Sequence, residues 1–148
     1  MSGQEAEIID PERAQRLLRA ARQARAGSYS PYSNFPVGAA LLDTEGKVYL
    51  GANIENAAYG LSMCAERTAL HHAVASGVRS FVAIAVVGPP GAESCTPCGS
   101  CRQALNEFAA TLPVITSQGT DGFVVSSISE LLPRAFGPSN LAEARGEG

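Results

Sequence analysis

Three cysteines and one glutamate are the residues of this sequence whose types and spacing could support chemistry. Cys64 and Glu66 stand at the start of SMCAERTALHHAV, which has the pattern of an amphipathic helix. Cys98 and Cys101 stand at the start of a second predicted helix, GSCRQALNEFA. A helix N-terminus favours a thiolate over a thiol, because of its dipole and its free N–H groups. If these two helix starts meet, they bring three thiolates together.

Zinc accepts a set of three thiolates, and a catalytic zinc site typically has three protein ligands and one open position. Glu66 would then lie beside the metal without being a ligand, and could take a proton from a metal-bound water. Three thiolates and Zn²⁺ together carry a charge of about −1, which opposes that deprotonation. We therefore expect a nearby cation. Arg67 and Arg102 directly follow Glu66 and Cys101, and Arg67 is the favoured hydrogen-bond donor to sulfur.

Cys95 complicates this interpretation, because Cys95, Cys98 and Cys101 form a C-x2-C-x2-C pattern that also begins iron–sulfur and four-cysteine sites. Residue 105 is leucine, so the spacing of a cluster is not continued. We interpret Cys95 as a free cysteine in a loop. The alternative is a closed four-cysteine metal-binding module without catalysis. His71 lies too far along its helix to share the ion, about 10 Å from Cys64 at the usual helical rise.

Composition limits the partners and the location of the protein. The chain of 148 residues predicts a single domain, residues 1–148, with residues 1–9 and 142–148 as flexible tails. A net charge of −3 and a pI near 5.3 argue against a nucleic-acid partner. There is no apolar run of membrane-spanning length and no signal peptide, so we expect no membrane partner and a cytoplasmic location. In that compartment cysteines are metal ligands or catalysts more often than disulfides.

The elements that must position these residues follow from turn signals and apolar runs. Asp10-Pro11-Glu12 starts a helix that extends to about Arg25 and contains five arginines at intervals of three, which we interpret as a solvated face with local acid partners. This helix is followed by a hairpin, the helix at Cys64, a buried strand, the helix at Cys98 and two strands. We expect a last short helix, capped by Ser127 or Ser129. This order predicts an α/β domain with a mixed sheet. The predicted strands lie in VGAALLD, KVYLGANI, FVAIAVVG, LPVITS and FVVSS.

Four segments of the chain resemble the small, single-domain, zinc-dependent cytidine deaminases. They are YSPYSNFPVGAALL, GANIENAAYGLSMCAERTAL, PCGSCRQALNEF and LLPRAFGP, and they follow one another in the order and spacing of that family. The resemblance spans most of residues 28–137. It implies a three-layer α/β/α sandwich around a mixed five-stranded sheet. It also implies a homotetramer whose subunits complete one another's sites.

The resemblance also implies roles for individual residues. Cys64, Cys98 and Cys101 would bind one zinc ion per chain, and Glu66 would carry protons from the zinc-bound water to N3 and to the leaving amine. The remaining residues would bind the substrate: Phe35 packs against the base, the backbone at Ala65 contacts the pyrimidine edge, Asn53 and Glu55 hold the ribose hydroxyls, and Tyr59 and Phe136 reach into a neighbouring subunit's site.

These observations predict a hydrolase that converts cytidine and 2′-deoxycytidine to uridine and 2′-deoxyuridine, with release of ammonia, in pyrimidine salvage. An acidic chain without a basic groove fits a free nucleoside better than a nucleotide, and the carboxylate of Glu55 suits hydroxyls and repels phosphate. The alternative within the same chemistry is deamination of another cytosine-bearing small molecule, such as a blasticidin-type nucleoside antibiotic.

Overall fold

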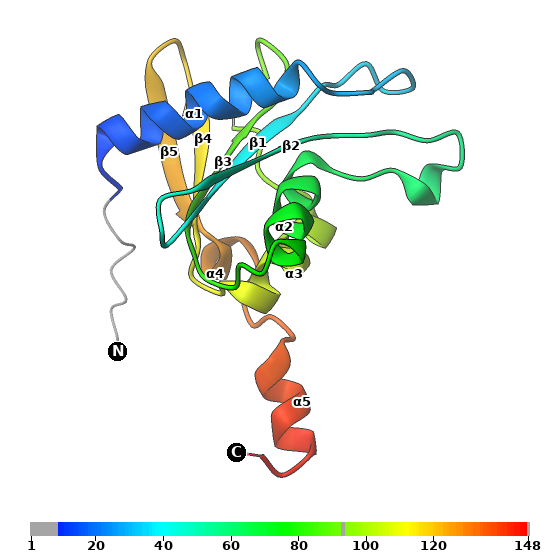
Figure 1. The fold of residues 1–148 in the computed structure, drawn as a ribbon, viewed down its shortest axis with the longest axis vertical. Helices are drawn as coiled ribbons and strands as arrows, with labels where there is room; N and C mark the ends of the chain where they lie inside the picture. Colours follow the sequence, from blue (N-terminus) through cyan, green and yellow to red (C-terminus); the bar gives the residue numbers. More distant parts are fainter. Residues whose placement is uncertain (1–8, 93, 148) are drawn as a thin grey trace.

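A five-stranded mixed sheet forms the centre of the computed structural model, which describes residues 9–92 and 94–147 (Figure 1). The strand order is β2-β1-β3-β4-β5. Strand β1 pairs antiparallel with β2 and β3, β3 pairs parallel with β4, and β4 pairs antiparallel with β5. The strands are β1 (Gly38–Asp43), β2 (Val48–Ala52), β3 (Phe81–Val87), β4 (Pro113–Gln118) and β5 (Gly122–Ser127).

Helices cover both faces of this sheet, which makes the three layers that the sequence predicts. Helix α1 lies across one face, while α2, α3 and α4 cover the other (Figure 1). Each interface has its own apolar core. Because the central strands contact both cores, all of β1 and most of β3 are buried. The helices are α1 (Pro11–Arg25), α2 (Ala65–Ala75), α3 (Gly99–Phe108), α4 (Ile128–Leu131) and α5 (Pro138–Ala144).

The predicted helix starts are confirmed by their caps. The Asp10 carboxylate accepts a hydrogen bond from the Glu12 backbone N–H at 3.2 Å, and Pro11 is the first helical residue. Ser127, one of the two predicted caps of the short helix α4, accepts from the Glu130 N–H at 3.1 Å. These local signals therefore fix where α1 and α4 begin.

Two short helical elements are absent from the sequence prediction. One is a 3-10 turn, η1 (Tyr59–Leu61), within a loop that projects beyond the sheet. The other is α5, which begins at Gly137-Pro138, where Asn140 Oδ1 accepts from the Gly137 N–H at 2.8 Å. Helix α5 extends away from the rest of the chain (Figure 1).

The predicted C-terminal tail, residues 142–148, begins inside α5, and its flexibility stays a prediction, as does that of residues 1–9. Residues 1–8 and 148 lie outside the described residues. No helix in the described part of the chain is long and apolar enough to cross a membrane.

The start of helix α2 packs unusually close to strand β2, and a glycine makes this possible. A Cβ atom added at Gly51 would lie 2.2 Å from the Ala65 carbonyl oxygen and 2.6 Å from the Ala69 backbone nitrogen. Both atoms are backbone, so neither can move without shifting the helix. Gly51 therefore sets the position of the first turn of α2, which carries Cys64 and Glu66.

We expect Gly51→Ala to lower the free energy of unfolding by about 1–3 kcal/mol, because the new methyl group overpacks the contact between helix and strand. Thermal unfolding of the purified variant measures this. Gly60→Ala is the matched control, since a Cβ there has no atom within 4 Å. Equal stability of the two variants would contradict the assigned role of Gly51.

Candidate active site

Two helix N-termini meet beside the sheet and bring three thiols together. Cys64 is the N-cap residue of α2 and Cys98 is the N-cap residue of α3, and neither side chain makes a capping hydrogen bond. Cys101 lies one turn into α3 and is buried. The positive ends of both helix dipoles therefore point at one cluster of sulfur atoms, as the sequence predicted.

The spacing of the sulfurs suits a single tetrahedral metal ion. The distance from Cys98 Sγ is 3.7 Å to Cys64 Sγ and 3.5 Å to Cys101 Sγ, and all three sulfurs lie within 4.8 Å of one another. Zn–S bonds of about 2.3 Å at tetrahedral angles place sulfurs about 3.8 Å apart, whereas a disulfide requires about 2.05 Å. The three cysteines are free thiols. The donor set and its spacing therefore fit zinc.

The surroundings of the cluster favour a thiolate at Cys64. A hydrogen bond from the Cys101 thiol and another from Arg67 lower the pKa of Cys64 to about 5, although partial burial opposes this shift. The same hydrogen bond to Cys64, together with burial, raises the pKa of Cys101. The cluster therefore already holds negative charge at Cys64 near neutral pH, and a cation would favour loss of the remaining protons.

Arg67 supplies positive charge directly to this cluster. One terminal nitrogen of its guanidinium, Nη2, lies 3.6 Å from Cys64 Sγ. Its Nε atom is buried and has no hydrogen-bond partner among the described residues. The hydrogen bond to Cys64, with the nearby Cys101, raises the pKa of Arg67 further, so the side chain stays cationic. The guanidinium is thus placed to withdraw charge from the sulfurs.

Glu66 lies beside the thiols but outside the cluster that could hold the ion. Its side chain is only 5% exposed and lines the same hollow as Cys64 and Cys98. Burial raises the pKa of the carboxyl group, and the negative Cys64 adds to this effect, while Arg67 opposes it. A raised pKa makes this carboxyl group a better proton acceptor than an ordinary glutamate, as a proton carrier requires.

The hollow in front of the thiols has a volume of about 390 Å³, which is suitable for a small organic molecule. It is lined by three residues that the sequence predicts to bind substrate, namely Phe35, Asn53 and Ala65. Ser33 also lines this hollow, although the sequence analysis did not single it out. A serine in a loop rich in serine and proline carries no distinguishing sequence signal.

Glu55 and Tyr59 line an adjoining hollow of about 340 Å³, and Ser33 borders both hollows. Phe136 lines neither of them. It lies on the C-terminal segment and is 59% exposed. The described residues of one chain therefore bring together most of the predicted substrate residues, while Phe136 stays apart.

Asn53 and Glu55 are also structural anchors of the loop that carries Phe35. Asn53 Oδ1 accepts from the Val37 N–H at 2.8 Å, and its Nδ2 donates to the Phe35 carbonyl at 2.9 Å. The Glu55 carboxylate accepts from the backbone N–H groups at residues 32 and 33 and from the Ser33 hydroxyl. The hydroxyl bond, followed by the N–H bonds, lowers the pKa of Glu55, which is therefore ionised.

Cys95 lines the hollow but does not belong to the sulfur cluster. It points toward the backbone of Gly88, where an added Cβ would lie 3.1 Å from the Cys95 sulfur. Burial raises the pKa of this thiol, and the nearby Glu66 adds to the shift. In the described part of the chain, the metal-competent cysteines are thus three and not four.

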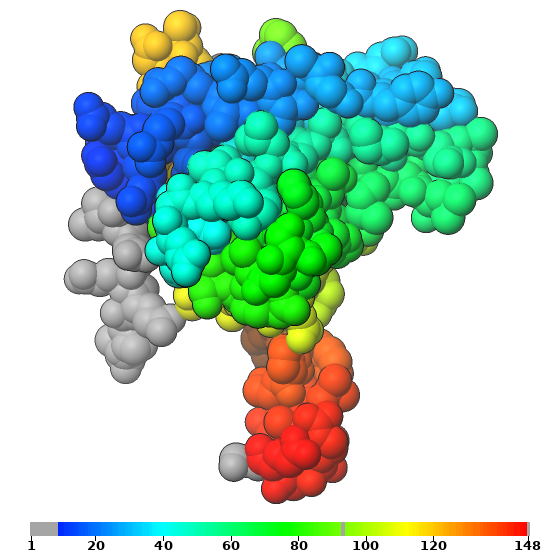
Figure 2. Space-filling view, in the orientation of Figure 1, coloured from blue at the N-terminus to red at the C-terminus, as the bar shows by residue number. Residues whose placement is uncertain are grey.

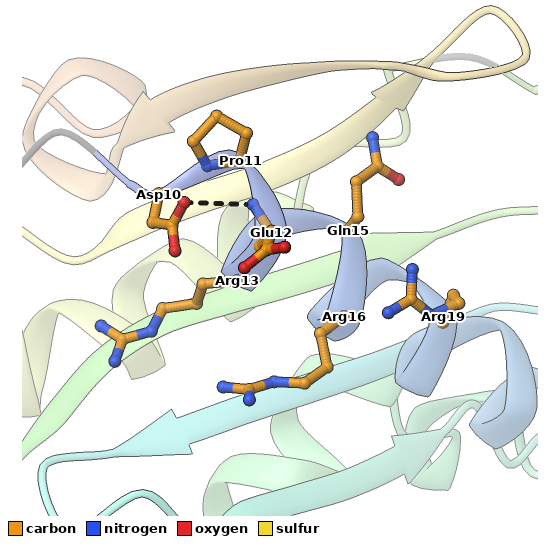
Figure 3. A pocket seen from close by; sticks show the side chains of 7 residues that line it. All are labelled: Asp10, Pro11, Glu12, Arg13, Gln15, Arg16 and Arg19. Carbon is orange, nitrogen blue, oxygen red and sulfur yellow. Dashed lines mark hydrogen bonds between the residues drawn. The ribbon is translucent and has the colours of Figure 1, made fainter.

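A third hollow, of about 610 Å³, lies beside the start of α1 (Figure 3). Arg13, Arg16 and Arg19 border it and are exposed, as expected of a solvated helix face, whereas Arg22 and Arg25 are half-buried and Arg25 Nη1 donates to the Gly88 carbonyl. Among the described residues no acid partner of these arginines is found, and the ion pair there joins Arg145 and Glu147. Since α1 covers the opposite face of the sheet from α2 and α3, this hollow is separate from the thiols.

Comparison with known proteins agrees with this geometry. A family model described as the cytidine and deoxycytidylate deaminase zinc-binding region matches residues 11–116. A cytidine deaminase from Sporosarcina psychrophila is 44% identical over 131 residues, which cover 88% of this chain and 96% of that protein. A cytidine deaminase from Halalkalibacterium halodurans is 50% identical over 123 residues, or 82% of this chain and 92% of that protein.

Solved structures show the same fold. The crystal structure of cytidine deaminase from Burkholderia pseudomallei matches with a TM-score of 0.77 and 50% identity, covering 82% of this chain and 98% of that one. The crystal structure of cytidine deaminase from Mycobacterium tuberculosis matches with a TM-score of 0.73 and 39% identity, covering 83% of this chain and 96% of that one. The predicted three-layer α/β fold is therefore confirmed.

We expect Cys95→Ser to keep about one zinc per chain, and Cys101→Ser to lose zinc affinity by more than about 100-fold, because only the latter removes a ligand. Elemental analysis after dialysis against a weak chelator measures both. Loss of zinc from the Cys95 variant would instead support a closed four-cysteine site.

Proposed function

Because the chain belongs to the cytidine deaminase family, we propose that it hydrolyses cytidine and 2′-deoxycytidine to uridine and 2′-deoxyuridine, with release of ammonia, in pyrimidine salvage. The observation that carries this proposal is the buried Glu66 carboxyl group beside three convergent thiols at the base of an open hollow. This arrangement combines a site for a Lewis acid, a proton carrier and room for a substrate.

In this proposal Cys64, Cys98 and Cys101 hold one zinc ion per chain. When bound, zinc supplies a Lewis acid that makes water nucleophilic near neutral pH. Arg67 donates toward the Cys64 sulfur and lowers the charge that the thiolates present. Without such a cation, three thiolates would oppose removal of a proton from the attacking water.

Glu66 carries protons between the attacking water and the base. Its buried carboxylate takes a proton as water adds to C4 of the cytosine ring, and gives a proton to N3. A second proton follows the same route to the exocyclic nitrogen, which then leaves as ammonia while the carbonyl of the uracil ring forms. The raised pKa of Glu66 supports this role, because the group must release its proton as readily as it accepts one.

The rest of the hollow holds the nucleoside. We assign Phe35 to packing against the base and the backbone at Ala65 to the pyrimidine edge, since both line the hollow next to Glu66. Asn53 and the ionised Glu55 bind the ribose hydroxyls. Their bonds to the loop would keep the amide and the carboxylate in place before the substrate arrives.

A free nucleoside suits this site better than a nucleotide. Neither of the two adjoining hollows is lined by a lysine, an arginine or a histidine within the described residues. Glu55 and Glu66 both bear carboxyl groups there, and a phosphate near them would be repelled. The family model covers deaminases of cytidine and of deoxycytidylate. Of these two kinds of substrate, the site therefore favours the one without a phosphate.

We further propose a homotetramer in which neighbouring subunits complete each site. Two loops project from the body side by side, joined through the Tyr29–Ile54 bridge and an edge-to-face contact of Tyr32 with Tyr59 (Figure 2). Large apolar side chains are exposed there, including Tyr59 at 75%. Burying them against another copy would stabilise an assembly and would bring Tyr59 to a neighbour's site. We assign the same role to Phe136, which is exposed on the separate C-terminal segment.

We propose that the enzyme is a single catalytic domain located in the cytoplasm. The two apolar cores share one sheet, which supports a single catalytic domain for residues 1–148. Pyrimidine salvage takes place in the cytoplasm, and we propose that location here. Nucleic acid and membrane are not partners in this proposal, since the net charge is −3.

We expect the purified, zinc-loaded protein to convert cytidine and 2′-deoxycytidine, and to act on deoxycytidylate at least about 100-fold less efficiently, because the hollow offers no cation to a phosphate. The loss of cytosine absorbance and the release of ammonia measure kcat/KM for each substrate. Zinc without conversion of either nucleoside would contradict the proposal. Blasticidin-type nucleosides, run in parallel, would then show whether the same chemistry serves another substrate.

We expect Glu66→Gln to keep zinc but to lower kcat by about 10²–10⁴-fold or more, because the amide cannot carry a proton. Turnover and zinc content are measured on the same preparation. Glu45→Gln, in the exposed β1–β2 turn, is the matched control and should retain full activity. Normal turnover by the Glu66 variant would show that protons move by another route.

A further inference from the structure

Helix α3 carries part of the thiol cluster, and it also contacts the C-terminal segment that contains Phe136. Its first turn carries two of the three clustered thiols, those of Cys98 and Cys101. Its next residues contact the segment that begins with the last residue of α4 and leaves the body, residues 131–137, which we call the C-terminal arm. The arm contains Phe136 and leads into α5.

Arg102 links these two parts with all three of its guanidinium nitrogens. Nε donates to the Pro97 carbonyl at 2.7 Å, and Nη2 donates to the Thr96 hydroxyl at 3.3 Å, so two nitrogens hold the loop that ends at Cys98. The third nitrogen, Nη1, donates to the Leu131 carbonyl at 2.8 Å, at the start of the arm. A planar guanidinium that satisfies three acceptors has one orientation, so movement of the loop displaces its contact with the arm.

The other end of the arm is also held by α3. Gln103 Nε2 donates to the Phe136 carbonyl at 2.8 Å, and Asn106 Nδ2 lies 3.4 Å from the same oxygen. A Cβ atom at Gly137 would lie 3.1 Å from Asn106 Nδ2, so the chain passes close to the helix there. The direction in which Phe136 leaves the body is therefore set by the same helix that begins at Cys98.

We propose that Arg102 is a positioning residue that couples metal binding at the thiols to the placement of the C-terminal arm. This inference rests on the proposed zinc site. An ion held by Cys98 and Cys101 would fix the loop at Thr96-Pro97, and Arg102 transmits that constraint to Leu131. Because such coupling is reciprocal, a well-placed arm tightens the hold on the metal. Metal loading would in this way prepare Phe136 for contact with a neighbouring subunit.

Amide hydrogen exchange of the arm, with and without zinc, tests the coupling directly. In the wild-type protein, removal of zinc by a chelator should speed exchange of the arm about tenfold, while peptides from α1 serve as an unchanged reference. In zinc-loaded Arg102→Gln the arm should already exchange fast, with little further change when zinc is removed. Arg102→Lys, which can satisfy fewer acceptors, should lie between these two.

Two variants separate coupling from a general loss of hydrogen bonds. Arg79→Gln also removes an arginine that donates to two backbone carbonyls, those of Val74 and Val78, but it has no link to the cysteine loop and should behave like the wild type. Gln103→Leu loosens only the far end of the arm. It should speed exchange near Phe136 and leave the response of Leu132 to zinc intact.

Zinc affinity, measured at equilibrium by competition with a chromogenic chelator, supplies the reciprocal measurement. We expect Arg102→Gln to bind zinc about 5- to 20-fold more weakly than the wild type or Arg79→Gln. Equal affinities, or an arm whose exchange in the wild type does not depend on zinc, would overturn the coupling alone. A wild-type protein that binds no zinc would contradict the proposed function itself. Arg102→Lys keeps the test decisive if the glutamine variant does not fold.

Discussion

Mutual repulsion of closely spaced sulfurs is the constraint on which the rest of this structure depends. Three thiols within 4.8 Å cannot all ionise unless positive charge surrounds them. The chain supplies part of that charge from two helix N-termini and from the guanidinium of Arg67, and a bound cation would supply the rest. Each of these sources acts only over a short range, so the helix starts must be placed within a few ångströms of one another.

The sheet makes this placement possible. Helices α2 and α3 follow β2 and β3 along the chain, cover the same face of the sheet and share one apolar core. This packing fixes the positions of the two helix axes. Gly51 then lets the first turn of α2 approach β2 more closely than any side chain would allow. Buried apolar side chains thus determine the approximate position of the thiols. The absence of a Cβ at Gly51 then sets how closely the first turn of α2 approaches the sheet. Most residues of the core have no chemical role, yet the geometry of the site depends on them.

The helix starts and the meeting of the three cysteines could be predicted from the sequence because their signals are local. Asp10-Pro11 indicates the start of α1, apolar runs indicate the strands, and the spacing of Cys98 and Cys101 at a helix start indicates a ligand pair. The bonds between Glu55 and the loop at Ser33 could not be predicted, since they join residues 22 positions apart on either side of the β1–β2 hairpin. Helix α5 was missed because its polar sequence carries no apolar periodicity, and its start depends on one local hydrogen bond from Gly137 to Asn140.

The distribution of charge around the hollow explains how one small site can serve both metal chemistry and substrate selection. The cation nearest the thiols, Arg67, contacts sulfur and does not line the hollow, so an anionic substrate cannot compete for it. The carboxyl groups of Glu55 and Glu66 face the space that the substrate would enter. Arg67 therefore lies behind the sulfurs, and the acidic groups lie in front of them. In the proposed function this separation would favour a metal ion and a neutral, hydroxyl-bearing molecule at the same time, and it would be lost if an arginine facing the hollow replaced the one behind the sulfurs.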